Sequence, residues 1–368
     1  MMTYTLSMNK RIGSVDAFRA LAIIKMLLCH FVLYLSADRE PNSWIVLSLC
    51  GPYASFGAQF FTFTVGLSFY FSDKKHWADG RSHGFKHHMR RAGLIFLIGI
   101  IFSILAWSFD GALDWDILTL IAFSIFVLAL VRKLPSSFIL LLAVSVILAA
   151  PFLRGIADFD SYWRHETFEY AARWDGLHDL VGFLVTGYFP VFPWLFFPLS
   201  GYLVARGIFE ESGRGTIWAR GLFVLGLVLV VLGPLLQLLG NSANFNLRGS
   251  FYPLSTFRLL ASIGLCLLVF VCFHFVFDIR GRHVPQYFES MSRSSLTLYL
   301  AHHFLILWPL WIIGALDEDV AKYFQKSMEP YLALLLGLAF LLLWIPISKA
   351  WKARGYRFGA EWALKYLT

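Results

Sequence analysis

The sequence has few charged residues. They make up 15% of its 368 residues, whereas a soluble domain has about 25%. Hydrophobic residues reach 58%, above the roughly 45–50% that is usual for soluble domains. Because a water-soluble core cannot bury this excess, the composition excludes a soluble globular protein and indicates an integral membrane protein.

Cysteine is also scarce. The four cysteines are Cys29, Cys50, Cys266 and Cys272, and no two of them have a CxxC or CxH spacing. Cys29 and Cys266 lie inside apolar runs, where a free cysteine behaves as a small apolar residue. We therefore expect neither a disulfide framework nor a metal site.

The sequence also lacks internal repeats, low-complexity linkers and the two matching halves with broken helices that are typical of secondary transporters. We therefore expect one membrane domain over residues 1–368, with a basic tail at 349–368. The net charge of +8 does not indicate a nucleic-acid partner, because the basic residues cluster in short loops between apolar segments. No small-residue cleavage site follows the first apolar run, so we expect it to remain as a helix.

About 20 apolar residues are needed for a helix to cross a bilayer. The sequence predicts ten such segments, at 17–35, 53–72, 92–109, 116–132, 137–153, 179–205, 217–240, 254–278, 294–314 and 330–348. The expected fold is an all-α polytopic membrane protein with about ten transmembrane helices.

Charge in the loops predicts the orientation of these helices. The loop 73–91 and the tail 349–368 are basic, whereas the loops 110–116 and 154–178 are acidic or mixed. Because basic loops stay in the cytoplasm, both termini are expected there. The expected location is a bacterial cytoplasmic membrane, with membrane lipids as partners.

Polar residues interrupt the first apolar segment. Arg19 and His30 are eleven residues apart, close to three helical turns, so they share one face and lie about 16 Å apart along the axis. Asp16 lies one turn before Arg19 and can pair with it. Lys25 points away from this face, and a charge in mid-membrane costs at least about 2.5 kcal/mol.

Each of these residues also has a structural interpretation. Arg19 alone is compatible with an anchor at the membrane surface, Lys25 with a structural pair and His30 with a packed core histidine. Ionisable residues inside a membrane are rare, however, and usually mark a site or a pathway. Arg19 and His30 on one face therefore favour a functional site.

Three further polar residues lie in later apolar segments. His302 and His303 fit either packed core positions or a cavity, and adjacent helical histidines point in different directions, so they make a poor metal site without distant partners. Arg258 fits an interfacial anchor, a group that steers an acceptor or an oxyanion stabiliser.

Two stretches have unusual local patterns. Three prolines in "YFPVFPWLFFPLSG" predict an irregular sixth transmembrane helix, because proline removes a backbone hydrogen bond. The aromatic stretch "SYWRHETFEYAARW" at 161–174 predicts a surface helix.

Five stretches in order carry a family resemblance. They are "RIGSVDAFRALAIIKML", "FGAQFFTFTVGLSFYFS", "DILTLIAFSIFVLALV", "YFPVFPWLFFPLSGYLVAR" and "SSLTLYLAHHF". In these stretches, from residue 11 to about 310, the sequence resembles the transmembrane acyltransferase superfamily, which includes the acyltransferase-3 enzymes. The resemblance is closest to the heparan-alpha-glucosaminide N-acetyltransferase catalytic-domain family.

The resemblance implies transfer of an acyl group, usually acetyl, from cytosolic acyl-CoA to a hydroxyl or amine of a glycan or lipid-linked sugar on the far side. In the lysosomal enzyme the first helix ends in Asn and a histidine follows later, whereas here the helix ends in His30. This difference favours His30 as the catalytic group, acting either as a base or as the carrier of an acyl intermediate. Imidazole does either near neutral pH.

The remaining candidate residues have binding or supporting roles. We expect the phosphates of acetyl-CoA to contact Arg19, Lys10, Arg11, Arg90 and Arg91. The supporting residues are Asp16, Lys25, Arg258, His302 and His303. The alternative is a small-molecule transporter or a flippase for lipid-linked sugars that uses the intramembrane Lys, His and Arg residues. A homodimer is compatible with either function.

Overall fold

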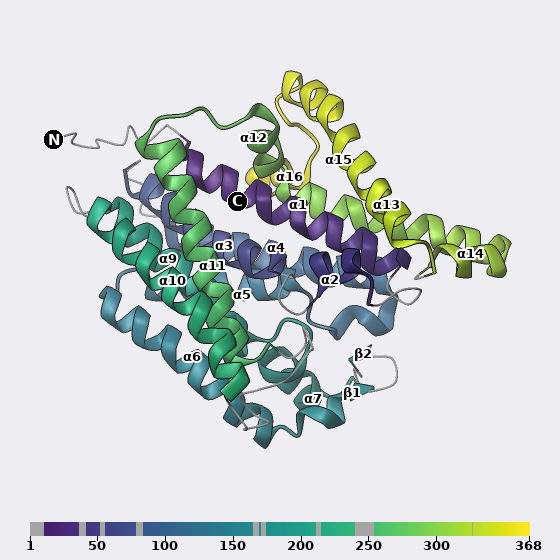
Figure 1. Ribbon diagram of the computed structural model, residues 1–368, viewed down its shortest axis with the longest axis horizontal. Helices are drawn as coiled ribbons and strands as arrows, with labels where there is room; N and C mark the ends of the chain where they lie inside the picture. The colour runs from purple at the N-terminus through teal and green to yellow at the C-terminus, as the bar shows by residue number, and fades with distance from the viewer. Residues whose placement is uncertain are drawn as a thin grey trace. The chain divides into compact units, whose positions relative to one another are not determined.

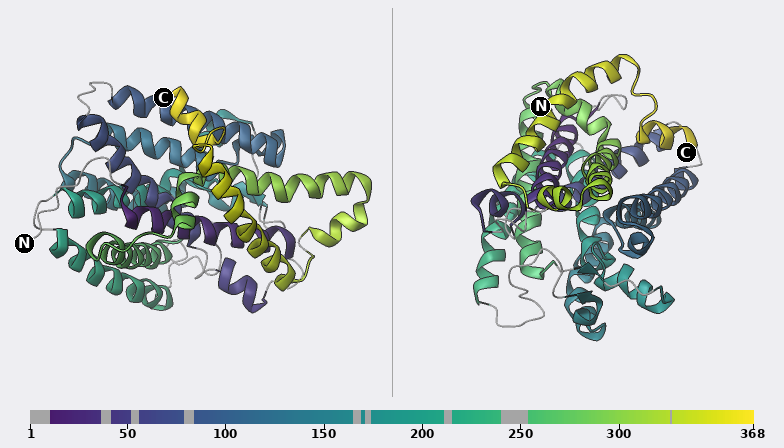
Figure 2. Two further views of the ribbon diagram at one scale, coloured as in Figure 1. Left: turned by 90° about the horizontal axis from the view of Figure 1, so that it is seen from above. Right: turned by 90° about the vertical axis from the view of Figure 1, so that its right-hand side faces the viewer.

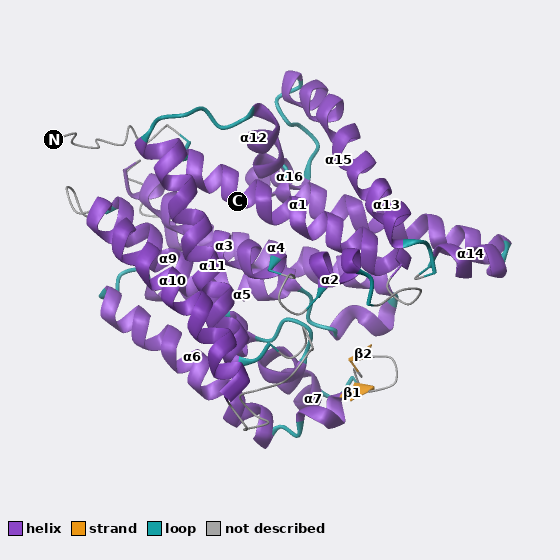
Figure 3. Cartoon of the chain, in the orientation of Figure 1, coloured by secondary structure: helices purple, strands orange, loops and turns teal. Residues whose placement is uncertain are grey.

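A computed structural model describes residues 11–36, 42–51, 56–78, 84–164, 169–170, 174–210, 215–239, 254–325 and 327–368. Nearly all of these residues are helical or in loops, and within these ranges the strands are limited to the pair β1 (Trp163–Arg164) and β2 (Glu169–Tyr170) (Figure 3). The α-helices are α1 (Gly13–Ser36), α2 (Trp44–Cys50), α3 (Gly57–Ala78), α4 (Gly84–Trp107), α5 (Ile117–Val131), α6 (Ser136–Ile156), α7 (Gly176–Val181), α8 (Val191–Trp194), α9 (Phe196–Phe209), α10 (Gly215–Leu239), α11 (Thr256–Phe273), α12 (Gln286–Arg293), α13 (Ser295–Leu316), α14 (Glu318–Phe324), α15 (Pro330–Ala353) and α16 (Ala360–Leu367).

The described residues contain 9 helical segments that are long and apolar enough to cross a membrane. They coincide with nine of the ten predicted transmembrane segments, so the prediction of a helical, multi-pass membrane protein is confirmed. The predicted segment 53–72 corresponds to α3, which is not among the nine. The crossing by α3 and the cytoplasmic location of both termini stay predictions.

Buried polar side chains explain why α3 is less apolar than the other helices. Gln59, Thr62 and Thr64 are buried, and both threonine hydroxyls donate to backbone carbonyls of the same helix. Gly66 of α3 and Gly201 of α9 lie where the two helices touch, and an added Cβ at either would collide with the partner backbone. Because protein rather than lipid covers much of α3, it does not need an apolar surface.

The chain forms two compact units. The first contains Met1–Val15, Gln59–Gly281 and Thr368, and the second contains Asp16–Ala58 and Arg282–Leu367. The expectation of one domain over residues 1–368 stays a prediction. Within the first unit, α10 and α11 lie side by side (Figures 1 and 2), and a Cβ at Gly226 or Gly264 would press on the facing helix.

The sixth predicted transmembrane helix is irregular, as its prolines predicted. It consists of α7, a π-helical turn at Gly182–Thr186, α8 and α9. Phe192 inside α8 has non-helical φ and ψ angles, and Pro193 follows it. Proline thus divides the segment into short pieces instead of one continuous helix.

The predicted surface helix at 161–174 was wrong where the structure describes it. Trp163 pairs with Tyr170 across the antiparallel strands β1 and β2, and the rest of the described stretch contains no α-helix. The two rings lie 6.0 Å apart, and the indole of Trp163 donates to the carbonyl of Thr186. Such cross-strand aromatic contacts stabilise a strand pair, and the amphipathic pattern did not distinguish the two structures.

A small apolar core holds the second unit together. It joins α1, α2, α13 and α15 through Phe31, Val32, Leu35, Ile45, Val46, Ile306, Leu310, Met328 and Ala333. The backbone N–H of Met328 donates to the carbonyl of Leu35. Since this core begins next to His30 on α1 and one turn beyond His302 on α13, it fixes both helices close to these histidines.

Candidate active site

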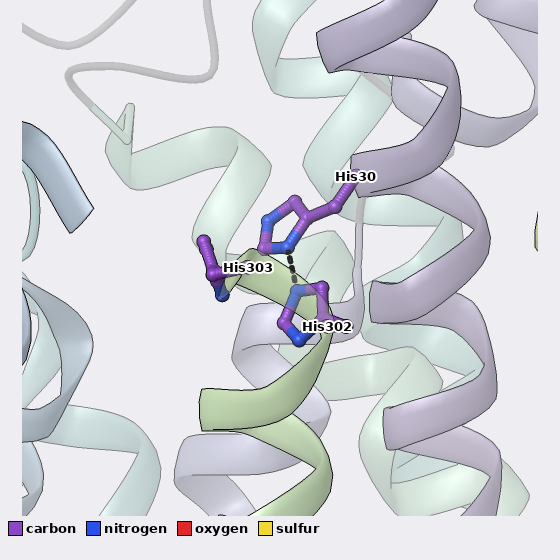
Figure 4. A group of neighbouring side chains, drawn as sticks. All are labelled: His30, His302 and His303. Carbon is purple, nitrogen blue, oxygen red and sulfur yellow. Dashed lines mark hydrogen bonds between the residues drawn. The ribbon is translucent and has the colours of Figure 1, made fainter. Parts of the chain in front are cut away.

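Three histidines meet inside the second unit (Figure 4). His30 comes from α1, and His302 and His303 come from α13. Nδ1 of His30 lies 2.7 Å from Nε2 of His302, and the two rings are stacked with their centroids 5.0 Å apart. The ring of His303 lies edge-on to that of His30, also at 5.0 Å. The structure therefore joins the predicted catalytic residue to two of the predicted supporting residues.

Backbone carbonyls determine which nitrogen of each neutral ring carries the proton. Nδ1 of His302 lies 3.0 Å from the carbonyl of Leu298 and must donate to it, because a carbonyl only accepts. Nε2 of His302 then holds the lone pair, so Nδ1 of His30 donates to it. Nε2 of His30 is therefore left as the basic nitrogen of the pair.

The same argument applies to His303. Its Nδ1 lies 3.0 Å from the carbonyl of Tyr299 and donates to it, so Nε2 carries the lone pair. The ring of Tyr34 packs on both His30 and His303, with centroids 5.4 Å and 5.8 Å away. The cluster therefore lies between aromatic side chains on well-packed helices.

Hydrogen bonds at Ser292 tie α1 to the segment that leads into α13. Nη1 of Arg19 lies 3.2 Å from both the carbonyl and the hydroxyl oxygen of Ser292. The same hydroxyl donates to Asp16 at 2.7 Å. Asp16 and Arg19 thus meet through Ser292, and their direct pairing stays a prediction.

Glu361 caps the start of α13. Its carboxylate accepts from the backbone N–H groups of Leu296 and Thr297, and from the hydroxyl of Thr297 at 2.6 Å. A carboxylate at this end of a helix satisfies unpaired N–H groups and complements the helix dipole. The C-terminal helix α16 therefore fixes the beginning of the helix that carries His302 and His303.

Lys25 has a structural partner, which is one of the two interpretations that the sequence allowed. Its Nζ donates to the carbonyl of Ser48 at 3.0 Å, near the C-terminal end of α2, and lies over the ring of Phe56. A cation at a helix C-terminus is favourable, so Lys25 stabilises the packing of α2 on α1. Nearby, Sγ of Cys29 lies 2.9 Å from Sγ of Cys50, and both are free cysteines.

The other predicted site residues belong to the first unit or lie outside the described residues. Arg11, Arg90 and Arg91 are exposed at the beginning of the chain and on α4. Arg258 is buried near the start of α11. Its backbone N–H donates to the hydroxyl of Ser255, which caps this helix. Lys10 lies outside the described residues.

A basic cavity in the first unit was missed by the sequence analysis. Its volume is about 430 Å³, and it is lined by Tyr70, Asp73, Lys74, Arg132, Lys133, Tyr202, Arg206 and Glu210. Four cations and two carboxylates line it, which gives a net positive charge. The sequence does show basic residues at the ends of several apolar segments. Such residues usually set the orientation of a membrane protein, and only their proximity in space shows that these ones line a cavity.

Apolar helices, two of which carry the histidine cluster, define a multi-pass membrane protein with an intramembrane imidazole centre. Residues 11–239 match the family described as heparan-alpha-glucosaminide N-acetyltransferase, catalytic. The match covers more than half of the chain, which therefore belongs to this family of membrane acetyltransferases. It includes Arg19 and His30 but ends before α13, so the stretch at 294–304 lies outside it. A comparison with curated proteins finds no match.

Proposed function

We propose that the protein transfers an acetyl group from cytosolic acetyl-CoA to a hydroxyl or amine of a glycan or lipid-linked sugar on the outer side of the membrane. The observation that supports this most is the bond between His30 and His302, which leaves the lone pair of His30 on Nε2. Acyl transfer needs such a nitrogen as a base or as a nucleophile.

The chemistry at His30 has two forms. In direct transfer, Nε2 takes the proton from the acceptor, whose oxygen or nitrogen bonds to the acetyl carbon while the carbon–sulfur bond breaks and the thiolate leaves. In the two-step form, Nε2 itself bonds to the acetyl carbon while the carbon–sulfur bond breaks and the thiolate leaves. The acceptor then bonds to the acetyl carbon, the bond to Nε2 breaks, and Nε2 takes the proton of the acceptor. His302 has the same role in both forms, because it accepts from Nδ1 and orients the ring.

The donor carries several phosphate charges and exists on the cytoplasmic side, where basic loops are expected to lie. Arg19, Arg90 and Arg91 are our candidates for these phosphates. The basic cavity is a second candidate, since its net positive charge suits an anion. The cavity does not include any of the predicted donor residues, so variants distinguish the two possibilities.

The test is a transfer assay with purified protein, radiolabelled acetyl-CoA and a pool of envelope glycans and lipid-linked sugars. We expect a labelled sugar product with the native protein and none with His30→Asn. Single-turnover labelling without acceptor separates the two forms, because only the two-step form leaves label on the protein. Uptake or flipping of an unmodified substrate without a labelled product would favour the transporter alternative.

Orientation is tested separately by labelling single cysteines. Positions in 73–91 and 349–368 should react from the cytoplasm, and positions in 154–178 should react from the opposite side. Labelling of 154–178 from the cytoplasm alone would contradict transfer across the membrane as proposed.

A further inference from the structure

The histidine cluster has the composition of a transition-metal site. The sequence showed only the adjacent pair on α13, and the structure adds His30 of α1 as the distant third partner. One nitrogen from each ring can be chosen so that all three lie within 4.8 Å of one another. His302 and His303 are 0% and 3% exposed, whereas His30 is partly exposed. Two members of the cluster are thus buried, and His30 is the partly exposed one.

Hydrogen bonds already orient two of the rings for metal binding. Nδ1 of His302 and Nδ1 of His303 donate to the carbonyls of Leu298 and Tyr299, so each ring presents Nε2 with its lone pair. Histidines that bind metals usually donate their other N–H to a carbonyl or carboxylate in this way. The carbonyls belong to the same helix as the rings and hold both of them in place.

We propose that His30, His302 and His303 bind a divalent transition-metal ion of the Zn²⁺ class, with a fourth position open to water or an anion. Three imidazoles with an open position are a known donor set for Zn²⁺, whereas Mg²⁺ and Ca²⁺ prefer oxygen ligands. The three neutral rings leave the charge of the ion uncompensated, which favours an anion such as hydroxide in the fourth position.

Small ring movements would complete the site. Zn–N bonds of about 2.0–2.1 Å in a tetrahedral arrangement place the nitrogens roughly 3.4 Å apart. The contact of 2.7 Å between His30 and His302 would therefore lengthen. When the metal binds Nδ1 of His30, the proton on that nitrogen would move to Nε2 of the same ring, which stays neutral. The wider separations, up to 4.8 Å, would shorten through side-chain rotation.

Metal binding would oppose the proposed acetyl transfer, and this consequence rests on the proposed function. A metal ion on His30 occupies a ring nitrogen and breaks the bond to His302 that orients the ring. Zn²⁺ should therefore inhibit transfer reversibly, and a chelator should restore it. The metal site itself does not depend on the transfer reaction.

The test uses the full chain, purified without a polyhistidine tag and freed of metal with a chelator. Titration with Co²⁺ should produce the visible absorption of a tetrahedral cobalt site with one ion per chain, and calorimetry with Zn²⁺ should give the same stoichiometry. His30→Gln, His302→Gln and His303→Gln should each weaken binding by at least about tenfold. His283→Gln is the matched control, because His283 is exposed and outside the cluster.

Folding is monitored by thermal unfolding, in which Zn²⁺ should raise the melting temperature of the native protein and the control but not of the three variants. Absence of saturable binding to the native protein, or unchanged affinity in all three variants, would overturn the proposal. Transfer measured in chelator reports on the proposed function alone, so failure of one proposal is distinguishable from failure of the other.

Discussion

Nδ1 of His30 donates to Nε2 of His302 across 2.7 Å, although the two residues are 272 positions apart in the sequence. The bond joins α1 to α13, and a second junction joins Arg19 of α1 to Ser292, which lies near the end of α12 and is 273 positions away. Because the two separations are nearly equal, α1 runs in the same direction as the stretch from Ser292 to His302. His30 is thereby held in one orientation by a partner that is itself fixed by a backbone carbonyl.

We expect His30→Asn to abolish acetyl transfer. Asparagine keeps a hydrogen-bonding side chain but neither accepts a proton nor forms an acyl-imidazole. Binding of acetyl-CoA should remain close to that of the native protein, since its headgroup is expected about 16 Å away along α1. Transfer assays and calorimetry measure the two effects. Near-full turnover in this variant would move the chemistry to another residue, with His302 and His303 examined next.

His302 should act as a positioning residue, and two variants separate this role from packing. Glutamine at this position can still accept from Nδ1 of His30, whereas His302→Phe fills the space without an acceptor. We expect kcat to fall by about 10–100-fold in His302→Phe and by less in His302→Gln, with KM nearly unchanged. Equal losses in both variants, accompanied by equal losses of thermal stability, would indicate a packing role alone.

The sequence predicted which residues of the site share one face of a single helix, but not which helices meet. The helical period places Arg19 and His30 on one face of α1, and composition identifies the membrane helices. The meeting of His30 with His302 was not accessible, since it depends on which helices pack together. For the same reason the partner of Lys25, the bridge at Ser292 and the basic cavity had no signal in local spacing. The strand pair at 163–170 was missed because its aromatic residues also suit an amphipathic helix.

The basic cavity offers a pH prediction at Glu210, which follows α9 outside the membrane-spanning segment. Burial raises the pKa of Glu210, but hydrogen bonds and charges from Lys74 and Arg206 outweigh it and hold the pKa below its usual 4.5. A lowered pKa in the folded protein stabilises the fold above the unfolded pKa, and this contribution disappears as pH falls below 4.5.

Glu210→Gln should therefore lower the melting temperature modestly at neutral pH, because partly exposed ion pairs contribute about 0.2–1 kcal/mol each. The difference from the native protein should shrink as the pH falls below 4.5. The control is Glu318→Gln, which removes an exposed pair with Lys322 and should change the melting temperature less. A difference that persists unchanged at low pH would assign the effect to packing instead of charge.

Arg19 should bind the donor in addition to joining α1 to Ser292. The guanidinium has five N–H donors in a planar arrangement that suits phosphate. Arg19→Ala should weaken the binding of desulfo-CoA by about tenfold or more, since a hydrogen bond to a charged group contributes roughly 1.5–3 kcal/mol. Arg19→Lys should restore the affinity only partly, because an ammonium cannot make paired contacts.

Ser292→Ala is the control for Arg19→Ala, since it removes the hydroxyl contact and keeps the guanidinium. If Arg19→Ala and Ser292→Ala lower the melting temperature alike and neither changes the affinity, Arg19 is a structural anchor and the donor phosphates bind elsewhere.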